Sequence, residues 1–185
     1  MINHKGTQQI ETDRLVLRKF SLEDANDMYN NWANDDSVTK YLTWPTHSSV
    51  DISKKVLGFT VESYDKKDTY SWAIFHKEKG EVIGSIGAVE VVDNQEQCTI
   101  GYCIGREFWG KGITSEALKA VINYFFVEVG FERLQAFYHS DNVASGKVML
   151  KAGMKYEGKL RHYQKSTKGN FADCDFYGII KSDYI

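Results

Sequence analysis

The chain has 185 residues, and its 23 lysines and arginines against 25 aspartates and glutamates give a net charge of −2. This balance provides no overall positive field for nucleic acid or an anionic membrane surface. Three cysteines, an odd number without metal-ligand spacing, suggest neither a disulfide framework nor a zinc site, and no apolar run reaches membrane-spanning length. Residues 1–9 also lack the apolar region of a signal peptide. We therefore expect one cytoplasmic domain, residues 1–185, that binds no metal, nucleic acid or membrane.

Helix and strand patterns alternate in the first third of the chain. Residues 14–20 alternate apolar and polar side chains, as a strand does, and residues 21–24 form a capping arrangement that opens a helix. A second helix is expected from about residue 49 to 64. The residues expected to face the core are Leu22, Ala25, Met28, Tyr29 and Trp32 in the first helix and Ile52, Val56 and Phe59 in the second. The irregular residues 34–47 fit a substrate-side wall and a loop packed into the core equally well.

Three consecutive antiparallel strands are expected next, at residues 70–76, 82–92 and 99–104, because polar turns separate them. Later elements are a long helix from residue 114 to Gly130, a strand at 132–139, a short helix from 141 to 153, and a hairpin of strands 155–164 and 173–180. Gly130 is typical of the left-handed residue that ends a helix. This order of elements favours an α+β sheet over a doubly wound parallel one.

The stretch from Ile100 to Ala117 combines a strand, a glycine-bearing loop and the start of the long helix. Gly110 and Gly112 allow several backbone N–H groups to point toward one place, in front of the positive end of the helix. Lys111 adds a cation between them. This combination predicts a phosphate site.

Two nucleotide-binding loops fit the stretch poorly. Gly105 to Lys111 has the G-x-x-x-x-G-K spacing of an ATP loop, but Gly112 stands where a serine or threonine must bind magnesium. The dinucleotide pattern fails as well, because Ser115 occupies the place of its third glycine. A P-loop nucleotide hydrolase is therefore not expected.

The stretch resembles the acetyl-coenzyme A loop of the GNAT superfamily of acetyltransferases, most closely its RimJ/RimL-type members. The matching segments are Ile100-Gly101-Tyr102, Phe108-Trp109-Gly110-Lys111-Gly112-Ile113, Ser115-Glu116-Ala117, Asn142-Val143-Ala144-Ser145, Lys151-Ala152-Gly153-Met154 and Glu157-Gly158. The start of the chain, residues 12–18, is similar to these members too. The resemblance implies the GNAT acyl-CoA N-acyltransferase fold, which has a mixed, mostly antiparallel central sheet, splayed in the middle and flanked by helices.

The resemblance also implies where acetyl-CoA would bind. Backbone amides from Gly110 to Thr114 would hold the pyrophosphate, and the strand edge ending at Ile104 would pair with the pantetheine arm. Asn142 would hydrogen-bond that arm, and Ser145 would lie near the sulfur. The implied cofactor-binding residues are Tyr102, Cys103, Ile104, Gly110, Lys111, Gly112, Ile113, Thr114, Asn142 and Ser145.

Direct attack by an amine on the thioester requires a base that takes a proton from the ammonium group. Glu90 is the first candidate and His139 the second, although the pattern favours a solvated strand residue for Glu90 slightly and a structural histidine for His139. Ser145 is the candidate acid for the departing thiolate, because Met149 stands where many superfamily members carry a catalytic tyrosine. The Ser145 hydroxyl could instead bond to its own helix backbone.

The implied function is transfer of an acetyl group from acetyl-CoA to a primary amine. The RimJ/RimL resemblance suggests a protein N-terminus as the acceptor, while polyamines, aminoglycosides and amino acids are alternatives on the same framework. A non-catalytic CoA-binding sensor or scaffold is the alternative from another class, and turnover of any amine would exclude it. A homodimer is compatible with the sequence.

Overall fold

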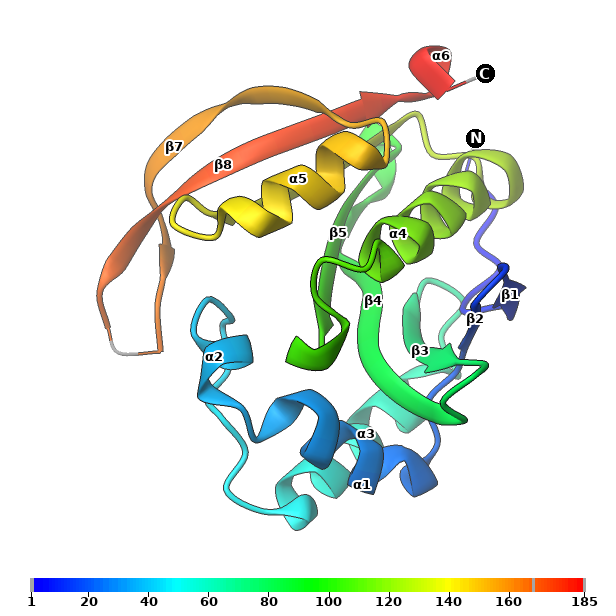
Figure 1. Cartoon of the computed structure of the whole chain (residues 1–185). Coiled ribbons are helices and arrows are strands. Elements are labelled where there is room, and N and C mark those ends of the chain that lie inside the picture. Colours follow the sequence, from blue (N-terminus) through cyan, green and yellow to red (C-terminus); the bar gives the residue numbers. More distant parts are fainter. Residues whose placement is uncertain (1, 168, 185) are drawn as a thin grey trace.

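Eight strands form one sheet in the order β1-β2-β3-β4-β5-β6-β8-β7 in a computed structural model, which describes residues 2–167 and 169–184 (Figure 1). The strands are β1 Ile10–Glu11, β2 Leu15–Arg18, β3 Ser71–His76, β4 Glu81–Val92, β5 Gln97–Ile104, β6 Arg133–His139, β7 Lys155–Lys165 and β8 Phe171–Ile180. Every neighbouring pair is antiparallel except β5 with β6. The predicted mixed, mostly antiparallel sheet is confirmed.

The α-helices are α1 Ala25–Met28, α2 Asp36–Thr39, α3 Val50–Ser63, α4 Ile113–Asn123, α5 Val143–Lys151 and α6 Lys181–Tyr184. π-Helical segments Tyr29–Ala33 and Tyr124–Val129 prolong α1 and α4, and single 3-10 turns lie at Leu22–Asp24, Asp93–Gln95 and Arg106–Phe108. Gly130 follows the second π-helical segment with φ +89°, as the sequence predicted for a helix end. Among the described residues, no helix has the length and apolar character to cross a bilayer.

Two apolar cores lie on opposite faces of the sheet. Trp72 and Ile74 of β3 belong to the larger core, whereas Ala73 between them belongs to the smaller one. Helices α4 and α5 supply the larger core, and α1 and α3 supply the smaller one (Figure 1). The strand alternation therefore tells which face each site residue occupies.

Strands β5 and β6 pair only at their first residues, Gln97–Thr99 with Arg133–Gln135. Beyond this junction β5 keeps its pairing with β4 as far as Ile104, and β6 keeps its pairing with β8 as far as His139. The two parallel strands therefore part in the middle of the sheet. The splay expected from the sequence is confirmed.

Helix α3 faces the core with a different side from the one expected. The three residues predicted to point inward are exposed, at 40% for Ile52, 38% for Val56 and 64% for Phe59. Ser53 and Leu57 point inward instead, and Ser53 Oγ lies 2.8 Å from Nδ1 of the buried His47. This polar pair helps to set the orientation of the helix, which hydrophobic periodicity alone could not predict. Leu22 is likewise exposed rather than buried.

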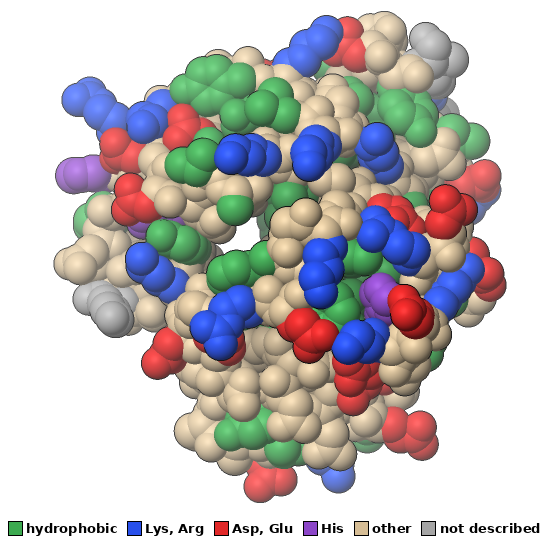
Figure 2. All heavy atoms as spheres, in the orientation of Figure 1, with side chains coloured by type: hydrophobic (Ala, Val, Ile, Leu, Met, Phe, Trp, Pro, Cys, Tyr) green, Lys and Arg blue, Asp and Glu red, His purple; other side chains and the backbone are tan. Residues whose placement is uncertain are grey.

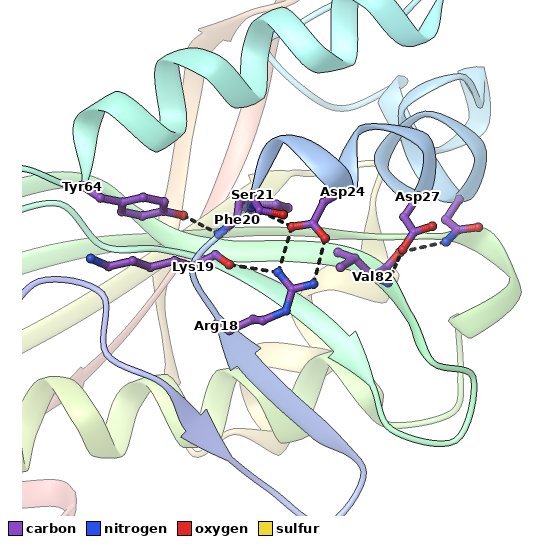
Figure 3. A network of polar contacts seen from close by, with 9 residues as sticks. Arg18, Lys19, Phe20, Ser21, Asp24, Asp27, Tyr64 and Val82 are labelled. Atoms are coloured by element: carbon purple, nitrogen blue, oxygen red, sulfur yellow. Dashed lines mark hydrogen bonds and ion pairs between the residues drawn. The ribbon is translucent and has the colours of Figure 1, made fainter.

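A polar network joins β2 to the helices beneath the sheet (Figure 3). Arg18 donates two hydrogen bonds of 2.8 Å to the buried carboxylate of Asp24, and these bonds raise the pKa of Arg18. Asp24 also accepts the backbone N–H of Ser21, at 2.8 Å, as the capping pattern predicted. The Tyr64 hydroxyl accepts the Phe20 N–H at 2.9 Å and so connects the end of α3 to the same place.

Candidate active site

The loop before α4 has the backbone of an anion site. Gly110 and Gly112 both lie in the left-handed region, at φ +73° and +77°, which glycine adopts without strain. The hydrogen bond that opens α4 runs from the Glu116 N–H to the Gly112 carbonyl, at 3.1 Å. The amides of residues 113–115 come before Glu116 in the chain. They have no acceptor within the helix, because the first amides of an α-helix lack intrahelical partners. These donors lie at the positive end of the helix.

Two residues anchor the helix start that follows the loop. Ile113 and Thr114 are buried, at 2% and 8% exposure, so their side chains fix the first turn of α4 in the core. The Lys111 ammonium lies 5.6 Å from the centre of the Phe108 ring. The sequence-based view that the backbone forms the site therefore fits the geometry of the loop.

A charged brace holds the loop from the N-terminal segment. Arg14 donates to the Lys111 carbonyl at 3.0 Å and to the Glu116 carboxylate at 2.7 Å, and the Thr12 hydroxyl donates to the same carboxylate at 2.6 Å. Burial alone would raise the pKa of Glu116, but the hydrogen bonds from Thr12 and Arg14 lower it overall. The start of the chain therefore positions the loop before α4, through contacts between residues about one hundred positions apart that the sequence did not reveal.

The predicted strand edge borders an opening. Past Thr99, β5 has no strand partner on its β6 side among the residues described. In the same region the surface is hollowed between α5, α2 and the loop before α4 (Figure 2). Of the predicted edge residues, Cys103 contacts Ser85 on the opposite face and Ile104 accepts the indole N–H of Trp109 at 3.0 Å. The Ile104 carbonyl is thus already engaged, while the rest of the β5 edge past Thr99 has no strand partner among the described residues and is available to an extended ligand, as in strand addition.

Tyr102 and Ser145 meet at this opening. The Tyr102 hydroxyl lies 2.9 Å from Ser145 Oγ and 3.1 Å from the Ser145 carbonyl oxygen. Burial raises the pKa of Tyr102 far above its ordinary value, so the phenol keeps its proton at neutral pH. Tyr102 was expected only at the cofactor edge, and its pairing with Ser145 was not predicted. The alternation of β5, which turns Tyr102 toward the α5 face, was the available signal.

Two other predictions concern helix α5. Asn142 is the residue before α5, and its backbone accepts the Ser145 N–H at 2.9 Å while its side-chain amide has no partner among the described residues. This free amide fits the predicted contact with a pantetheine arm. Met149 is 1% exposed and packs in the core. The usual tyrosine position therefore contributes no hydroxyl here, and Tyr102 brings one from the strand.

Glu90 lies on the other face of the sheet. It is exposed beside a bulge in β4, and its carboxylate accepts the Thr99 hydroxyl at 3.5 Å, while the Gln135 amide donates to that hydroxyl at 3.0 Å. Thr99 and Gln135 form the last pair before the strands part. Glu90 therefore sits at the closed end of the splay, facing away from the Tyr102–Ser145 pair.

His139 is at the open end of β6, where its ring packs 5.0 Å from that of Tyr41. Tyr41 therefore reaches the site from the irregular segment 34–47, and Trp44 of the same segment packs against His47 instead. The His139 Nδ1 accepts the Asp141 N–H at 3.3 Å. A neutral ring with this bond carries its proton on Nε2, which leaves no free lone pair for a substrate proton.

The described residues contain no group of three or more histidines, cysteines, aspartates and glutamates that could hold a metal ion. The site instead offers amide donors, an unpaired strand edge, a free carboxamide and a hydroxyl pair. This donor set fits a phosphate-bearing ligand with an extended amide chain.

Comparisons with known proteins agree with this geometry. Residues 14–155 match the acetyltransferase (GNAT) domain family. The chain is 32% identical over 177 residues to the uncharacterised N-acetyltransferase p20 of Bacillus licheniformis, which covers 96% of this chain and 98% of that one. It is 28% identical over 161 residues to the ribosomal protein uS5-alanine N-acetyltransferase of Escherichia coli (strain K12), over 84% of this chain and 82% of that one.

Solved structures share the fold. The crystal structure of a ribosomal-protein-S5-alanine acetyltransferase from Vibrio fischeri matches with a TM-score of 0.82 at 21% identity, over 96% of this chain and 99% of that one. The RimJ/RimL resemblance of the sequence is confirmed by the relatives. The chain belongs to the GNAT family of acetyltransferases, and it is an N-acetyltransferase that moves an acetyl group to an amine.

Proposed function

We propose that this chain binds acetyl-CoA, the acetyl donor of its family, in the splay between β5 and β6. The amides of residues 110–114 hold the pyrophosphate, and the β5 edge from Tyr102 to Ile104 pairs with the pantetheine arm. The Asn142 carboxamide hydrogen-bonds the same arm. The two left-handed glycines at the positive end of α4 support this placement. Bound acetyl-CoA supplies the acetyl group as a reactive thioester.

Ser145 and Tyr102 act together as the acid. When the Tyr102 phenol donates to Ser145 Oγ, the serine proton is free to pass to the departing thiolate. The 2.9 Å contact and the raised pKa of Tyr102, which keeps the phenol protonated, support this role. Tyr102 thus takes over the function for which Met149 has no hydroxyl.

Glu90 acts as the base. The amine must lose a proton before or during its attack, and Glu90 lies on the face opposite the acid pair. A base on one face and an acid on the other let the amine arrive and the sulfur leave on opposite sides of the reacting carbon. His139 is less suitable because its Nδ1 already accepts the Asp141 N–H.

The acceptor we propose is the N-terminus of a protein in the cytoplasm. The Escherichia coli relative that acetylates an alanine of a ribosomal protein supports this choice. Nothing about the described residues favours a polyamine, an aminoglycoside or a free amino acid in the same way. The homodimer and the single domain over residues 1–185 stay predictions.

The observation that carries the proposal is the Tyr102–Ser145 pair beside the splay. The test is release of free thiol from acetyl-CoA with N-terminal peptides, polyamines, aminoglycosides and amino acids as acceptors. With the best acceptor, Ser145→Ala and Tyr102→Phe should each lower kcat about 100-fold while leaving CoA affinity nearly unchanged. Tyr184→Phe, which removes a hydroxyl bonded to Asn123 away from the site, is the matched control. Wild-type rates in both site variants would refute the acid assignment.

A further inference from the structure

A pocket of about 520 Å³ adjoins the phosphate loop, and neither the pyrophosphate nor the pantetheine contacts proposed above account for its charged lining. Its lining includes Gly112, Glu116, Lys119 and Lys151, together with Asp13. Gly112 is also part of the amide site, so this pocket and the proposed pyrophosphate position share a wall.

Two lysines in this pocket have no hydrogen-bond or ion-pair partner within residues 2–167 and 169–184. Lys119 lies on α4 two turns after Gly112, about 10 Å along the axis, and on the same side of the helix. Lys151 ends α5, which packs beside α4. Both side chains are exposed, and neither ammonium makes a hydrogen bond or ion pair with any part of the chain that the structure describes. Lysine and arginine side chains gather over α4 and α5 on this face (Figure 2).

The other charges in the pocket are largely balanced. Glu116 is engaged by Arg14 at 2.6 Å, which neutralises its carboxylate. Lys119, Lys151 and the single carboxylate of Asp13 remain, so the pocket keeps a net positive charge. A helical side chain also leans toward the N-terminus of its helix, which directs Lys119 toward the phosphate loop. The pocket therefore attracts an anion next to the one held by the amides.

We infer that Lys119 and Lys151 bind the 3′-phosphate of coenzyme A and make the enzyme select CoA over 3′-dephospho-CoA. This inference rests on the proposed CoA site. The ribose of CoA carries a phosphate monoester besides the pyrophosphate, and this dianion needs its own cations once the amides of residues 110–114 hold the pyrophosphate. Two lysines acting as point charges suit such a group.

Calorimetric titration of the whole protein with CoA and with 3′-dephospho-CoA tests the inference. The wild type should bind CoA at least about tenfold more tightly than 3′-dephospho-CoA. Lys119→Gln and Lys151→Gln should each weaken CoA binding about fivefold, the upper range for an exposed ion pair, and leave 3′-dephospho-CoA binding unchanged. Lys55→Gln on α3, which removes one exposed positive charge outside the pocket, should change neither affinity.

A fourth variant should change the preference for CoA over 3′-dephospho-CoA in the direction opposite to that of the lysine variants. Asp13→Asn removes the carboxylate that repels a phosphate in the pocket, so the preference for CoA should rise; an unchanged preference would place the 3′-phosphate elsewhere. Equal wild-type affinity for the two ligands would overturn the inference and leave the proposed function intact. Equal losses for both ligands in the lysine variants would assign these lysines to the pyrophosphate and also overturn it. A wild type that binds neither ligand would refute the proposed CoA site first, and this inference with it.

Discussion

In the proposed CoA site, Gly112 combines two demands on one residue, a left-handed backbone and an uncrowded approach for phosphate. Its φ is +77°, and an added Cβ would meet only the Arg14 guanidinium, at 3.7 Å. Gly112→Asp should abolish measurable CoA binding, because it places a carboxylate where the phosphates bind and adds backbone strain of about 1–2 kcal/mol. Isothermal titration with CoA measures the loss.

Gly80→Asp separates the two effects. Gly80 has φ +71° in the exposed turn between β3 and β4, with no heavy atom within 4 Å of an added Cβ. It should show a similar loss of thermal stability with wild-type CoA affinity. If the Gly112 variant kept wild-type affinity, the loop would not be the phosphate site.

Glu90 and His139 differ in how available their lone pairs are, and kinetics can separate them. Glu90→Gln should lower kcat about 100-fold, because the carboxamide cannot take a proton. His139→Gln should change kcat less than about threefold. A larger loss of kcat in His139→Gln than in Glu90→Gln would reverse the assignment.

The sequence predicted the glycine-bearing loop before α4 because the left-handed backbone of Gly110 and Gly112 requires glycine and so leaves a visible pattern. It could not predict that Tyr102 meets Ser145, because those residues are 43 positions apart and no local rule joins them. The face of β5 on which Tyr102 lies follows from alternation, but which helix covers that face depends on the packing of the whole sheet.

At the scale of elements, β2 and α4 are coupled through the Arg14 brace. Arg14→Ala should weaken CoA binding about fivefold, since the loop loses the bonds that hold the Lys111 carbonyl and Glu116. Arg14→Lys should not restore affinity, because one ammonium cannot reproduce the guanidinium fork. Arg161→Ala on β7, an arginine without an ion pair among the described residues, is the control. Unchanged affinity in Arg14→Ala would show that the loop keeps its shape unaided.

The pair formed by His47 and Ser53 joins α3 to the segment before it, and it predicts a pH dependence. Burial lowers the pKa of His47 below its ordinary 6.5, so the unfolded chain takes up a proton more readily. The free energy of unfolding should therefore be constant above about pH 6.5 and fall below it, by at most about 1.4 kcal/mol per pH unit. Urea unfolding between pH 5 and 7.5 measures this slope.

His47→Gln should remove that part of the slope, whereas His162→Gln on the exposed hairpin should retain it. If the pH dependence persisted in the His47 variant, it would belong to another titrating group.

The pair of His47 and Ser53 also explains why the inward face of α3 was not predicted. Hydrophobic periodicity counts apolar residues, and here a buried serine and histidine help to set the orientation of the helix.

Across the whole molecule, the succession of strands β2 to β8 along the chain was predictable because alternation and turns mark these strands locally, and the splay followed from the resemblance. Filling the splay should stabilise the chain. At a CoA concentration 100 times Kd, binding adds about 2.7 kcal/mol to the free energy of unfolding and raises Tm by about 5–10 °C. Differential scanning calorimetry measures the shift, and Gly112→Asp should show none. Amide exchange should slow at residues 100–104; exchange unaffected there would contradict strand addition.

The junction of three residue pairs between β5 and β6 has a mechanical consequence. Among the described residues, strand pairing crosses the middle of the sheet only between Gln97–Thr99 and Arg133–Gln135, so this short segment works as a pivot for two levers. One lever is the body built on β1 to β5, and the other is β6, β8 and β7 with α5 (Figure 1). A small rotation at a pivot produces its largest displacement at the far ends of the arms. The width of the gap where Ile104 and His139 stand is therefore far more sensitive to rocking than the distance between Thr99 and Gln135.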